Sequence, residues 1–567
     1  MEQRPPLTQS HWTADPSQAL LEITLGDLLR RLAREVPERV AFVEALADAG
    51  ARRRWTYRQL LEDAQQVAAA LLRRHRPGDR IAVWAPNCAE WVLLQHGASL
   101  AGMVLVTVNP AYVADEVRHV LAASGASAIF HADRYRDCDM TAVVAQLRHA
   151  LPELRQAVPF PQWDRFVADG RGMPSALPEV RPGDMVQIQF TSGTTGRPKG
   201  ACLHHRGIVN AARFAAQRAG FPDGGVWATA MPLFHVGGCA GSQIGAMSSR
   251  GTFVLQPAFD AGAMLEIIES EKVEHLHAVP TMVLALLDHP QRPARQLGSL
   301  RMLMSGGSPV PAALVERARR ELGCRFTITF GQTELNGVVS QTSPDDTLER
   351  QTASIGRPAS QAELKIADPD TGAVRPLGEA GEVWVRGYQT MLGYFDSPEA
   401  TAETLVPDGW LRTGDLASMD AQGYLRIEGR LKDCIIRGGE NIYPREIENV
   451  LLAHPRVRQA CVVGTADARW GEVVAAVIEC EAGEAPSTLE LHHHCRRHLA
   501  PYKTPALWFF VDRYPTTSSG KIQKYVLRKW IAQKRLVPEA FEKPAARRSQ
   551  LRVQDAGESC GERSSRT

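Results

Sequence analysis

Short runs of apolar residues recur along the chain and alternate with stretches in which apolar residues stand three and four positions apart. The runs predict buried strands, and the wider spacing predicts amphipathic helices such as Ala312–Leu322. The predicted strands are Arg80–Trp84, Val104–Val108, Ser127–Phe130, Met185–Phe190, Val273–Ala278, Arg301–Met304 and Phe326–Phe330. Because strands and helices alternate, we expect an α/β fold with largely parallel sheets.

The pattern changes after about Val383, where shorter strands are separated by Gly and Asp turns that predict a β-rich subdomain. Further on, helices are expected at Pro444–Ala453 and Leu489–Leu499, and strands at Gln459–Gly464 and Val473–Cys480. This mixture predicts a small α+β domain. The expected organisation is a large domain at 1–429, a junction at 430–432, a small domain at 433–543 and a disordered tail at 544–567.

The segment from Trp91 to Ala114 carries no formal charge and is close to the length of a membrane span. It contains several polar residues and a proline, so we expect a buried helix, Trp91–Ala101, followed by a buried strand, Val104–Asn109. The sequence therefore predicts no integral membrane segment. The sequence does not decide whether the protein contacts a membrane peripherally.

Composition narrows the classes of protein to consider. The 567 residues exceed one typical domain, and 44% hydrophobic with 23% charged residues are the values of a soluble globular protein. A net charge of +2 gives no sign of nucleic-acid binding. Ten scattered cysteines without a Cys-x-x-Cys pair, and an N-terminus without an apolar core, predict a cytoplasmic location.

The stretch from Phe190 to Gly200 contains four hydroxyl residues, three glycines and one lysine. Backbone N–H groups and hydroxyls of such a loop can surround phosphate oxygens, and Lys199 adds positive charge. The preceding strand and a helix expected from Arg206 give the strand–turn–helix context of a phosphate loop. The spacing Gly-x4-Gly-Lys-Ser/Thr does not occur here, and a plain polar surface loop is the alternative.

The same residues resemble, nearly letter for letter, the phosphate loop of the adenylate-forming superfamily, which includes acyl-CoA synthetases, luciferases and peptide-synthetase adenylation domains. The resemblance implies ATP binding and activation of a carboxylate. It also implies that Thr191 takes part in catalysis and in holding Mg²⁺. The residues that it assigns to the phosphates are Thr191, Ser192, Gly193, Thr194, Thr195, Gly196 and Lys199.

A second motif, Thr329 to Glu334, lies at the end of a predicted strand, where open α/β sheets bind ligands. It resembles the superfamily's Tyr-Gly-x-Thr-Glu, with Phe330 in the place of Tyr. Phe330 and Gly331 are expected beside adenine, and Thr333 at the α-phosphate. Glu334 offers a hard oxygen ligand for Mg²⁺, and the resemblance implies that it also takes part in catalysis. A strand-end turn with one solvated acid is the alternative.

Further motifs follow in the order of the superfamily. Asp415, in Thr-Gly-Asp, is matched to the ribose hydroxyls, and Arg430 to ribose or phosphate. Lys432 is matched to the hinge of a mobile C-terminal domain, and Gly438 and Gly439 to a loop that helps bind CoA. An ordinary hairpin turn and a plain linker are the alternatives.

Three more sites complete the resemblance. It implies that Lys521 bridges the acyl carboxylate and the phosphate, and that His235 lies near the carboxylate. The adenine-side loop is matched by Gly306, Gly307 and Ser308. The histidines between His492 and His498 suggest a metal site, but we interpret them as a solvated helix face.

Together these motifs predict an AMP-forming acid–CoA ligase that resembles medium- and long-chain fatty acyl-CoA synthetases and uses ATP, Mg²⁺ and CoA. Aryl or alicyclic acids are the alternative substrates, and a luciferase-like oxygenase or an inactive nucleotide-binding scaffold are alternative functions. A peptide-synthetase domain is disfavoured, because no acidic residue near His235 would hold an ammonium group. The acyl pocket is expected around 227–238, 279–281 and 335–340. The sequence does not indicate the oligomeric state.

Overall fold

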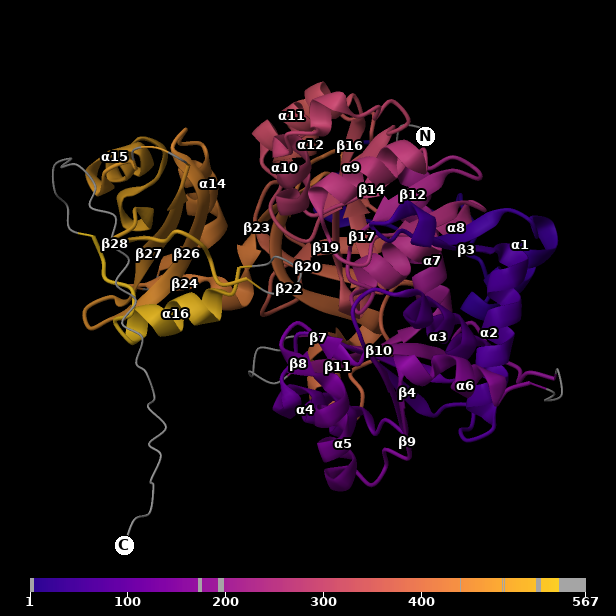
Figure 1. Ribbon diagram of the computed structural model, residues 1–567. Helices are drawn as coiled ribbons and strands as arrows, with labels where there is room; N and C mark the ends of the chain where they lie inside the picture. The colour runs from indigo at the N-terminus through magenta and orange to yellow at the C-terminus, as the bar shows by residue number, and fades with distance from the viewer. Residues whose placement is uncertain are drawn as a thin grey trace, which may run out of the picture. The chain divides into compact units, whose positions relative to one another are not determined.

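The structure is a computed structural model that describes residues 5–171, 176–191, 198–438, 440–481, 483, 485–516 and 522–539. The chain divides into two compact units, one up to Ile427 and the other from Glu428 (Figure 1). The tail from residue 544 lies outside the described residues. The domain limits expected from the sequence, 1–429, 430–432 and 433–543, stay a prediction.

A nine-stranded sheet forms the centre of the first unit. Its strands follow the order β18-β17-β16-β15-β14-β12-β13-β2-β3, and the six from β16 to β2 are parallel. Antiparallel pairs close both edges. The bounds are β2 Val40–Glu44, β3 Arg53–Thr56, β12 Val226–Thr229, β13 Thr252–Leu255, β14 His275–His277, β15 Met302–Gly306, β16 Arg325–Gln332, β17 Gly337–Gln341 and β18 Arg357–Pro358.

A second sheet has six strands in the order β11-β10-β5-β4-β6-β9. All its pairs are parallel except β10 with β11. The bounds are β4 Arg80–Trp84, β5 Val104–Val108, β6 Ala128–His131, β9 Gln156–Pro159, β10 Met185–Thr191 and β11 Lys199–His204. The predicted parallel-rich α/β architecture is confirmed.

Helices cover both faces of each large sheet, which explains why the strands are apolar on both sides. Phe42 and Phe253 face a core with α1, α2, α3, α7 and α8, whereas Val43 and Val254 face a core with α9, α10 and α11. The six-stranded sheet shares the first core, and its other face packs on α4 and α5. The bounds are α1 Leu25–Glu35, α2 Tyr57–Leu72, α3 Ala89–Leu100, α4 Ala114–Ser124, α5 Met140–Ala150, α7 His205–Arg218, α8 Gln243–Ser248, α9 Ala261–Ser270, α10 Pro280–Asp288 and α11 Ala312–Leu322.

The segment with the length of a membrane span is α3 followed by β5, as expected. Every residue of β5 is buried, and α3 packs in the core against α1 and α2. Within the described part of the chain, none of the helices has both the length and the apolar character that crossing a bilayer requires.

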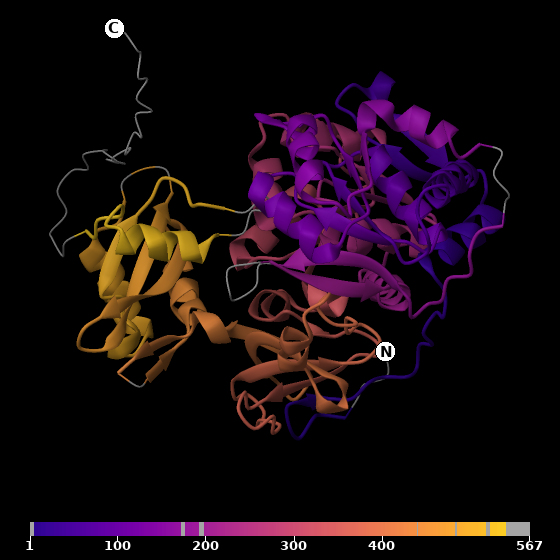
Figure 2. The same ribbon diagram turned by 90° about the horizontal axis from the view of Figure 1, so that it is seen from below.

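The expected β-rich subdomain is a third sheet, with the order β1-β19-β20-β22-β21. It begins earlier than the sequence suggested, at β19 (Glu363–Ala367), and includes β20 (Gly381–Arg386), β21 (Leu405–Val406) and β22 (Trp410–Met419). It also recruits β1 (His11–Trp12), which pairs antiparallel with β19. Figure 2 shows this N-terminal segment in indigo along the orange sheet.

The second unit is the predicted small α+β domain. Its sheet has the order β25-β24-β27-β26, with β28 beside β27. The bounds are β24 Ile435–Arg437, β25 Glu440–Ile442, β26 Val457–Asp467, β27 Gly471–Cys480, β28 Leu507–Phe510, α14 Pro444–Leu452, α15 Thr488–His498 and α16 Lys524–Ala532. The long β26–β27 pair forms its centre, with α14 and α15 on one core and α16 on another.

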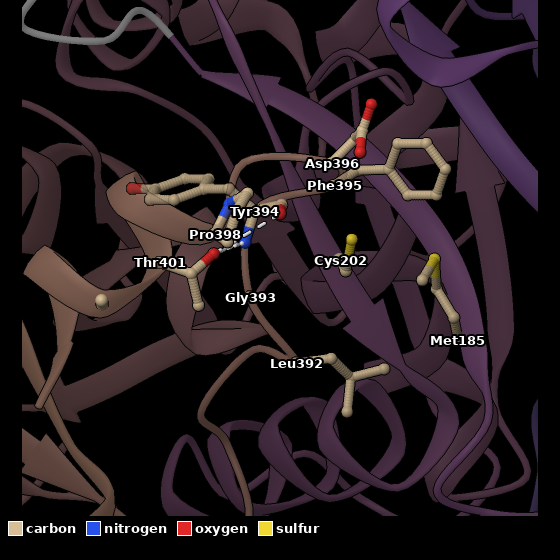
Figure 3. Close-up of a pocket in the computed structure, with 10 residues that line it drawn as sticks. Met185, Cys202, Leu392, Gly393, Tyr394, Phe395, Asp396, Pro398 and Thr401 are labelled. Atoms are coloured by element: carbon tan, nitrogen blue, oxygen red, sulfur yellow. Dashed lines mark hydrogen bonds between the residues drawn. The ribbon is translucent and has the colours of Figure 1, made fainter. Parts of the chain in front are cut away.

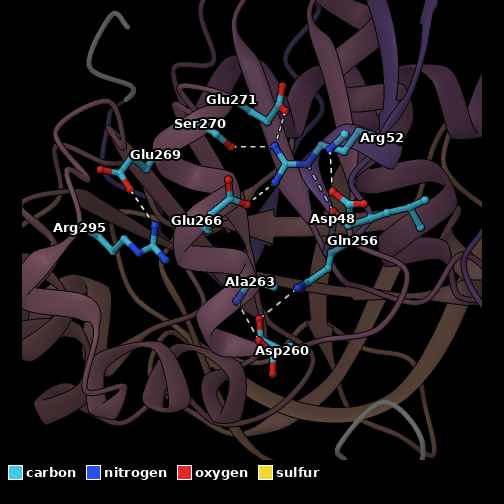
Figure 4. Close-up of polar contacts among 12 residues, drawn as sticks. Asp48, Arg52, Gln256, Asp260, Ala263, Glu266, Glu269, Ser270, Glu271 and Arg295 are labelled. Atoms are coloured by element: carbon cyan, nitrogen blue, oxygen red, sulfur yellow. Dashed lines mark hydrogen bonds and ion pairs between the residues drawn. The ribbon is translucent and has the colours of Figure 1, made fainter.

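A buried guanidinium ties the β3 edge of the first unit to helix α9. The Arg52 side chain is only 2% exposed and forms ion pairs with Glu266 and Glu271 (Figure 4). It also donates a hydrogen bond to the Ser270 hydroxyl at 2.8 Å. Because a buried charge is tolerated only when it is paired, these contacts fix the position of α9 against β3.

One prediction about the phosphate loop is wrong. The segment after it is not directly a helix, because β11 (Lys199–His204) intervenes and pairs antiparallel with β10, with Thr191 opposite Lys199. The helix expected from Arg206 is itself confirmed, because α7 begins at His205. The six residues of β11 include one glycine and one alanine and carry little strand signal of their own. Pairing with β10, which is buried from Val186 to Gln189, decides their conformation.

Among the described residues of the first unit, seven histidines are buried, and the effect on the pKa is largest for four of them. Burial lowers the pKa of the His96, His205, His275 and His277 imidazoles to about 4, below their ordinary value of 6.5. Between these two values the unfolded chain binds protons that the folded chain does not. The free energy of unfolding therefore decreases as pH falls from about 6.5 towards 4.

We expect the substitution His96→Gln to reduce this decrease in the free energy of unfolding at low pH. Its Nε2 lies 2.9 Å from the Gln243 amide nitrogen, and a glutamine side chain retains a hydrogen-bonding group there. The decrease in unfolding free energy between pH 7 and pH 5, measured by urea denaturation, should be smaller by about 2 kcal/mol. Exposed His149, replaced by Gln, is the control and should leave the decrease unchanged. An unaltered pH dependence in His96→Gln would contradict the prediction.

Candidate active site

The two strand ends that carry the first two motifs meet in the structure. Thr191 is the last residue of β10, and Glu334 lies in a 3-10 turn, Thr333–Leu335, directly after β16. The Thr191 hydroxyl donates a hydrogen bond to Oε1 of Glu334 at 3.0 Å. Two residues that are 143 positions apart thus join the six-stranded and nine-stranded sheets.

A third segment reaches the same carboxylate. The Tyr394 hydroxyl donates to Oε1 of Glu334 at 3.0 Å, and the Lys199 ammonium lies 5.4 Å from the centre of the Tyr394 ring. The tyrosine is held in place because residues around it pair with β11, including a bridge between Ala201 and Tyr394. Burial, together with the adjacent Glu334 carboxylate, raises the pKa of Tyr394 well above its ordinary value of 10, so the hydroxyl stays a donor.

Figure 3 shows Tyr394 at the edge of a surface pocket of about 420 Å³. The pocket is lined mainly by apolar side chains and lies towards the Met185 end of the β10–β11 hairpin, away from Thr191 and Lys199. Burial raises the pKa of the Cys202 thiol in this pocket to about 12, so the thiol is not a nucleophile at neutral pH.

The Phe330–Glu334 segment departs from regular strand geometry. The register between β16 and β17 shifts between Phe330 and Gly331. A side chain at Gly331 would lie 2.1 Å from the carbonyl oxygen of Gly337, so only glycine fits. Phe330 is half-buried against the main core, and Thr333 is buried. The shift places Gln332 towards Asp415.

Asp415, on β22, is only 3% exposed. Gln332 donates to its Oδ2 at 2.6 Å, and also to the carbonyl oxygen of Thr413 at 2.9 Å. The structure thus brings the predicted ribose ligand next to the predicted adenine and metal motif. Gln332 and Tyr394 are missing from the residues expected from the sequence. Gln332 stands at the variable position of its motif, and Tyr394 is 60 positions from Glu334.

The adenine-side loop follows β15. Gly306 is the last residue of β15. A side chain at this position would lie 2.3 Å from the carbonyl oxygen of Thr329, near the end of the neighbouring strand β16. Gly307 is exposed with φ at +75°, a conformation that favours glycine, and Ser308 is half-buried. This loop therefore lies beside the β16 end that carries Phe330.

His235 is half-buried before a π-helix, Gly237–Ser242, of the kind often found at functional sites. Its Nδ1 accepts a hydrogen bond from the Gly237 N–H at 3.2 Å. A side chain at Gly237 would lie 3.6 Å from the His235 ring and 3.7 Å from that of buried His277. The Ser242 hydroxyl, 2.8 Å from Nδ1 of His277, fixes the turn.

In the second unit, Arg430 ends β23 (Leu425–Arg430), and Lys432 lies in the following 3-10 turn, Leu431–Asp433. Both side chains are exposed. Gly438 lies in the turn between β24 and β25 with φ at +59°, and its N–H donates to the Trp470 carbonyl oxygen at 2.8 Å. Seven predicted residues lie outside the described part of the chain: Ser192, Gly193, Thr194, Thr195, Gly196, Gly439 and Lys521.

The histidine-rich segment is the helix α15, as expected, but it is not simply a solvated face. Nε2 of His494 lies 2.9 Å from the Val450 carbonyl oxygen on α14, and the ring lies 5.2 Å from those of His454 and His498. Among the described residues, no group of three or more His, Cys, Asp or Glu side chains is arranged to hold a metal ion.

Comparison with known proteins agrees with this geometry. Residues 29–395 match the AMP-binding enzyme family, and residues 446–521 match the AMP-binding enzyme C-terminal domain. The chain is 37% identical to the mouse medium-chain acyl-CoA ligase ACSF2, mitochondrial, over 91% of this chain and 88% of the relative.

Two solved structures are also similar. ATP-bound MatB from Rhodopseudomonas palustris has a TM-score of 0.80 and 28% identity, covering 89% of this chain and 99% of that one. Mycobacterium tuberculosis fatty acyl CoA synthetase has a TM-score of 0.73 and 30% identity, covering 90% and 99%.

The fold and the matches therefore define an adenylate-forming enzyme that uses ATP. The chain belongs to the AMP-binding enzyme family, and within it is an AMP-forming acid–CoA ligase. The alternatives of an inactive scaffold and an oxygenase are not supported by these relatives.

Tyr394→Phe tests the contact to Glu334. The change removes the hydroxyl that donates to this carboxylate but retains the ring beside Lys199. Since a hydrogen bond to a charged group contributes about 1.5–3 kcal/mol, we expect acid-dependent exchange of pyrophosphate into ATP to fall by about tenfold or more in kcat/KM.

Tyr424→Phe is the matched control, because the Tyr424 hydroxyl also donates to a carboxylate, that of Asp346. It should leave the exchange reaction unchanged. Equal activity of Tyr394→Phe and the wild type would show that Glu334 does not depend on Tyr394.

Proposed function

We propose that this ligase activates a medium- or long-chain fatty acid as an acyl-adenylate and then transfers the acyl group to CoA. The observation that carries the assignment of the site is the contact of Thr191 with Glu334, beside Tyr394 and Lys199. It gathers hydroxyl, carboxylate and ammonium groups at the ends of β10 and β16, where open α/β sheets bind ligands.

The chemistry requires these groups. A carboxylate is a poor electrophile, so it must first attack the α-phosphorus of ATP, and the pyrophosphate leaves. Negative charge then increases on the phosphate oxygens, and preorganised cations and donors stabilise it. Lys199 would supply positive charge, and the hydroxyls of Thr191 and Thr333 would donate to the phosphates. Arg430 would contact ribose or phosphate.

Thr191 and Glu334 would also hold Mg²⁺. A carboxylate and a hydroxyl are hard oxygen donors, which suit this ion, and the structure places the two side chains in contact. When bound, Mg²⁺ neutralises charge on the phosphates. The nucleoside would lie against Phe330 and Gly331, with Gly306, Gly307 and Ser308 on the adenine side and Asp415 at the ribose.

The acid would be bound near His235 and the π-helix. The surrounding residues 227–238, 279–281 and 335–340 are mostly small or apolar, which suits an alkyl chain. The name of the mouse relative, a medium-chain ligase, supports this choice. Aryl and alicyclic acids are the second candidate, because the same apolar side chains suit a ring.

The thioester step would use the second unit. The small domain would turn about Lys432, withdraw Lys521 and present the Gly438–Gly439 loop to CoA. Attack of the CoA thiol on the acyl-adenylate then releases AMP.

The expected cytoplasmic location stays a prediction, which fractionation of the producing cells can test.

A panel of acids of graded length tests the function and the choice of acid together. We expect pyrophosphate release to require an acid, and AMP release to require CoA as well. For straight-chain acids, kcat/KM should increase about fourfold per added CH₂ group until the pocket is filled, since burial of one CH₂ contributes about 0.8 kcal/mol. High activity on aromatic acids alone would contradict the fatty-acid assignment.

Lys521→Ala tests the division of labour between the two half-reactions. We expect loss of acyl-adenylate formation by about 100-fold or more, since a cation at the developing charge contributes several kcal/mol. Conversion of supplied acyl-adenylate to the thioester should persist. Lys529→Ala, which removes an exposed lysine of α16, is the control. An equal loss of both half-reactions would exclude the proposed role.

A further inference from the structure

Asp415 lies in a bulge of the third sheet. In the pairing of β20 with β22, Glu382 faces Leu416 and Trp384 faces Arg412. One residue of β20, Val383, therefore stands opposite three residues of β22, namely Thr413, Gly414 and Asp415. Gly414 has φ at +70°, which favours glycine. A bulge of this kind redirects a side chain, here the Asp415 carboxylate.

Glu382, on the neighbouring strand β20, stabilises the bulge through hydrogen bonds. Its Oε1 accepts a hydrogen bond from the Gly414 N–H at 3.0 Å. Its Oε2 accepts from the Trp384 indole at 2.8 Å and from Nε of Arg412 at 3.0 Å. The Glu382 side chain is only 2% exposed, and these donors compensate its buried charge.

Gln332 holds the bulge from the other side. Its amide nitrogen donates both to Oδ2 of Asp415 and to the Thr413 carbonyl oxygen. Thr413 in turn donates from its hydroxyl to the Val383 carbonyl oxygen at 2.7 Å and accepts the Asp415 N–H at 3.1 Å. The Asp415 backbone and one of its carboxylate oxygens are thus both fixed.

We propose that Gln332 and Glu382 are positioning residues that orient the Asp415 carboxylate and so determine how strictly the enzyme requires both ribose hydroxyls of ATP. The proposal rests on the proposed function, in which Asp415 binds the ribose. A site that is built to hydrogen-bond a hydroxyl discriminates strongly against an analogue that lacks it. This discrimination depends on a carboxylate whose direction is fixed within narrow limits.

The test compares ATP with 2′-deoxyATP and 3′-deoxyATP in acid-dependent pyrophosphate exchange. Gln332→Met retains the length of the side chain and removes its donor. Glu382→Gln places an amide where Gly414 and Arg412 both need an acceptor. We expect each variant to lose about tenfold in kcat/KM with ATP but much less with the deoxy analogues. The preference for ATP should then decrease about tenfold.

Gln351→Met is the matched control. The Gln351 amide is buried in α12 (Leu348–Ala353) and also donates two hydrogen bonds, to the carbonyl oxygens of Phe326 and Ser343. Its loss should lower the unfolding midpoint in urea and leave the nucleotide preference unchanged. If Gln332→Met and Glu382→Gln reduce activity with all three nucleotides by one common factor, their role is structural and the proposal is overturned.

Two further outcomes separate this proposal from the proposed function. If the wild type exchanges pyrophosphate but uses the deoxy analogues as well as ATP, the ligase assignment stands and the role of Asp415 and its partners is overturned. If Asp415→Asn abolishes the preference and Gln332→Met adds nothing in that background, the two residues act through one contact, as proposed. Additive losses in the double variant would contradict it.

Discussion

The hydrogen bond from Thr191 to Glu334 connects two sheets that have no strand in common. The six-stranded and nine-stranded sheets pack on one shared layer of helices, with α3 and α7 among them. That packing fixes the distance between the end of β10 and the end of β16. A displacement of one sheet against the other by a few ångströms would separate Glu334 from Thr191. The geometry of the site therefore depends on the packing of the whole first unit.

The backbone is irregular at three points of this site. The β16–β17 register shifts at Phe330 and Gly331, the β20–β22 register shifts beside Asp415, and a π-helix follows His235. Regular strands alternate their side chains between two faces, so they cannot direct several polar groups to one point. The register shifts turn individual side chains out of this alternation, so that polar groups from several strands can face one point. They are compatible with folding because the strands around them are buried on both faces and well paired.

The class of reaction and the choice of acid rest on different parts of the molecule. We expect ATP-dependent activation to use strand ends and glycine turns, which tolerate little variation because backbone groups approach each other closely at Gly306 and Gly331. The acid is expected against apolar side chains, where many combinations fill a similar volume. Relatives below 40% identity can therefore share the reaction, and we expect the particular acid to follow from side-chain packing around His235.

The sequence was sufficient for most elements of the fold. Apolar runs predicted β4 and β5, and the segment with the length of a membrane span was correctly divided into a helix and a strand. The motifs around Thr191, Glu334 and Asp415 were also visible as patterns of residue types. These features are local, because propensity, periodicity and turn chemistry act over a few neighbouring residues.

Other features were invisible in the sequence. The strand β11 was missed, because its few small residues adopt a strand only through pairing with β10. Gln332, Glu382 and Tyr394 were missed as well, because each forms its hydrogen bond with a residue that is between 32 and 83 positions away along the chain. By itself the sequence determined most of the elements, the family motifs and the reaction they imply. Tertiary structure alone decided which strand ends meet and which side chains orient the carboxylates, since register and packing depend on contacts between distant segments.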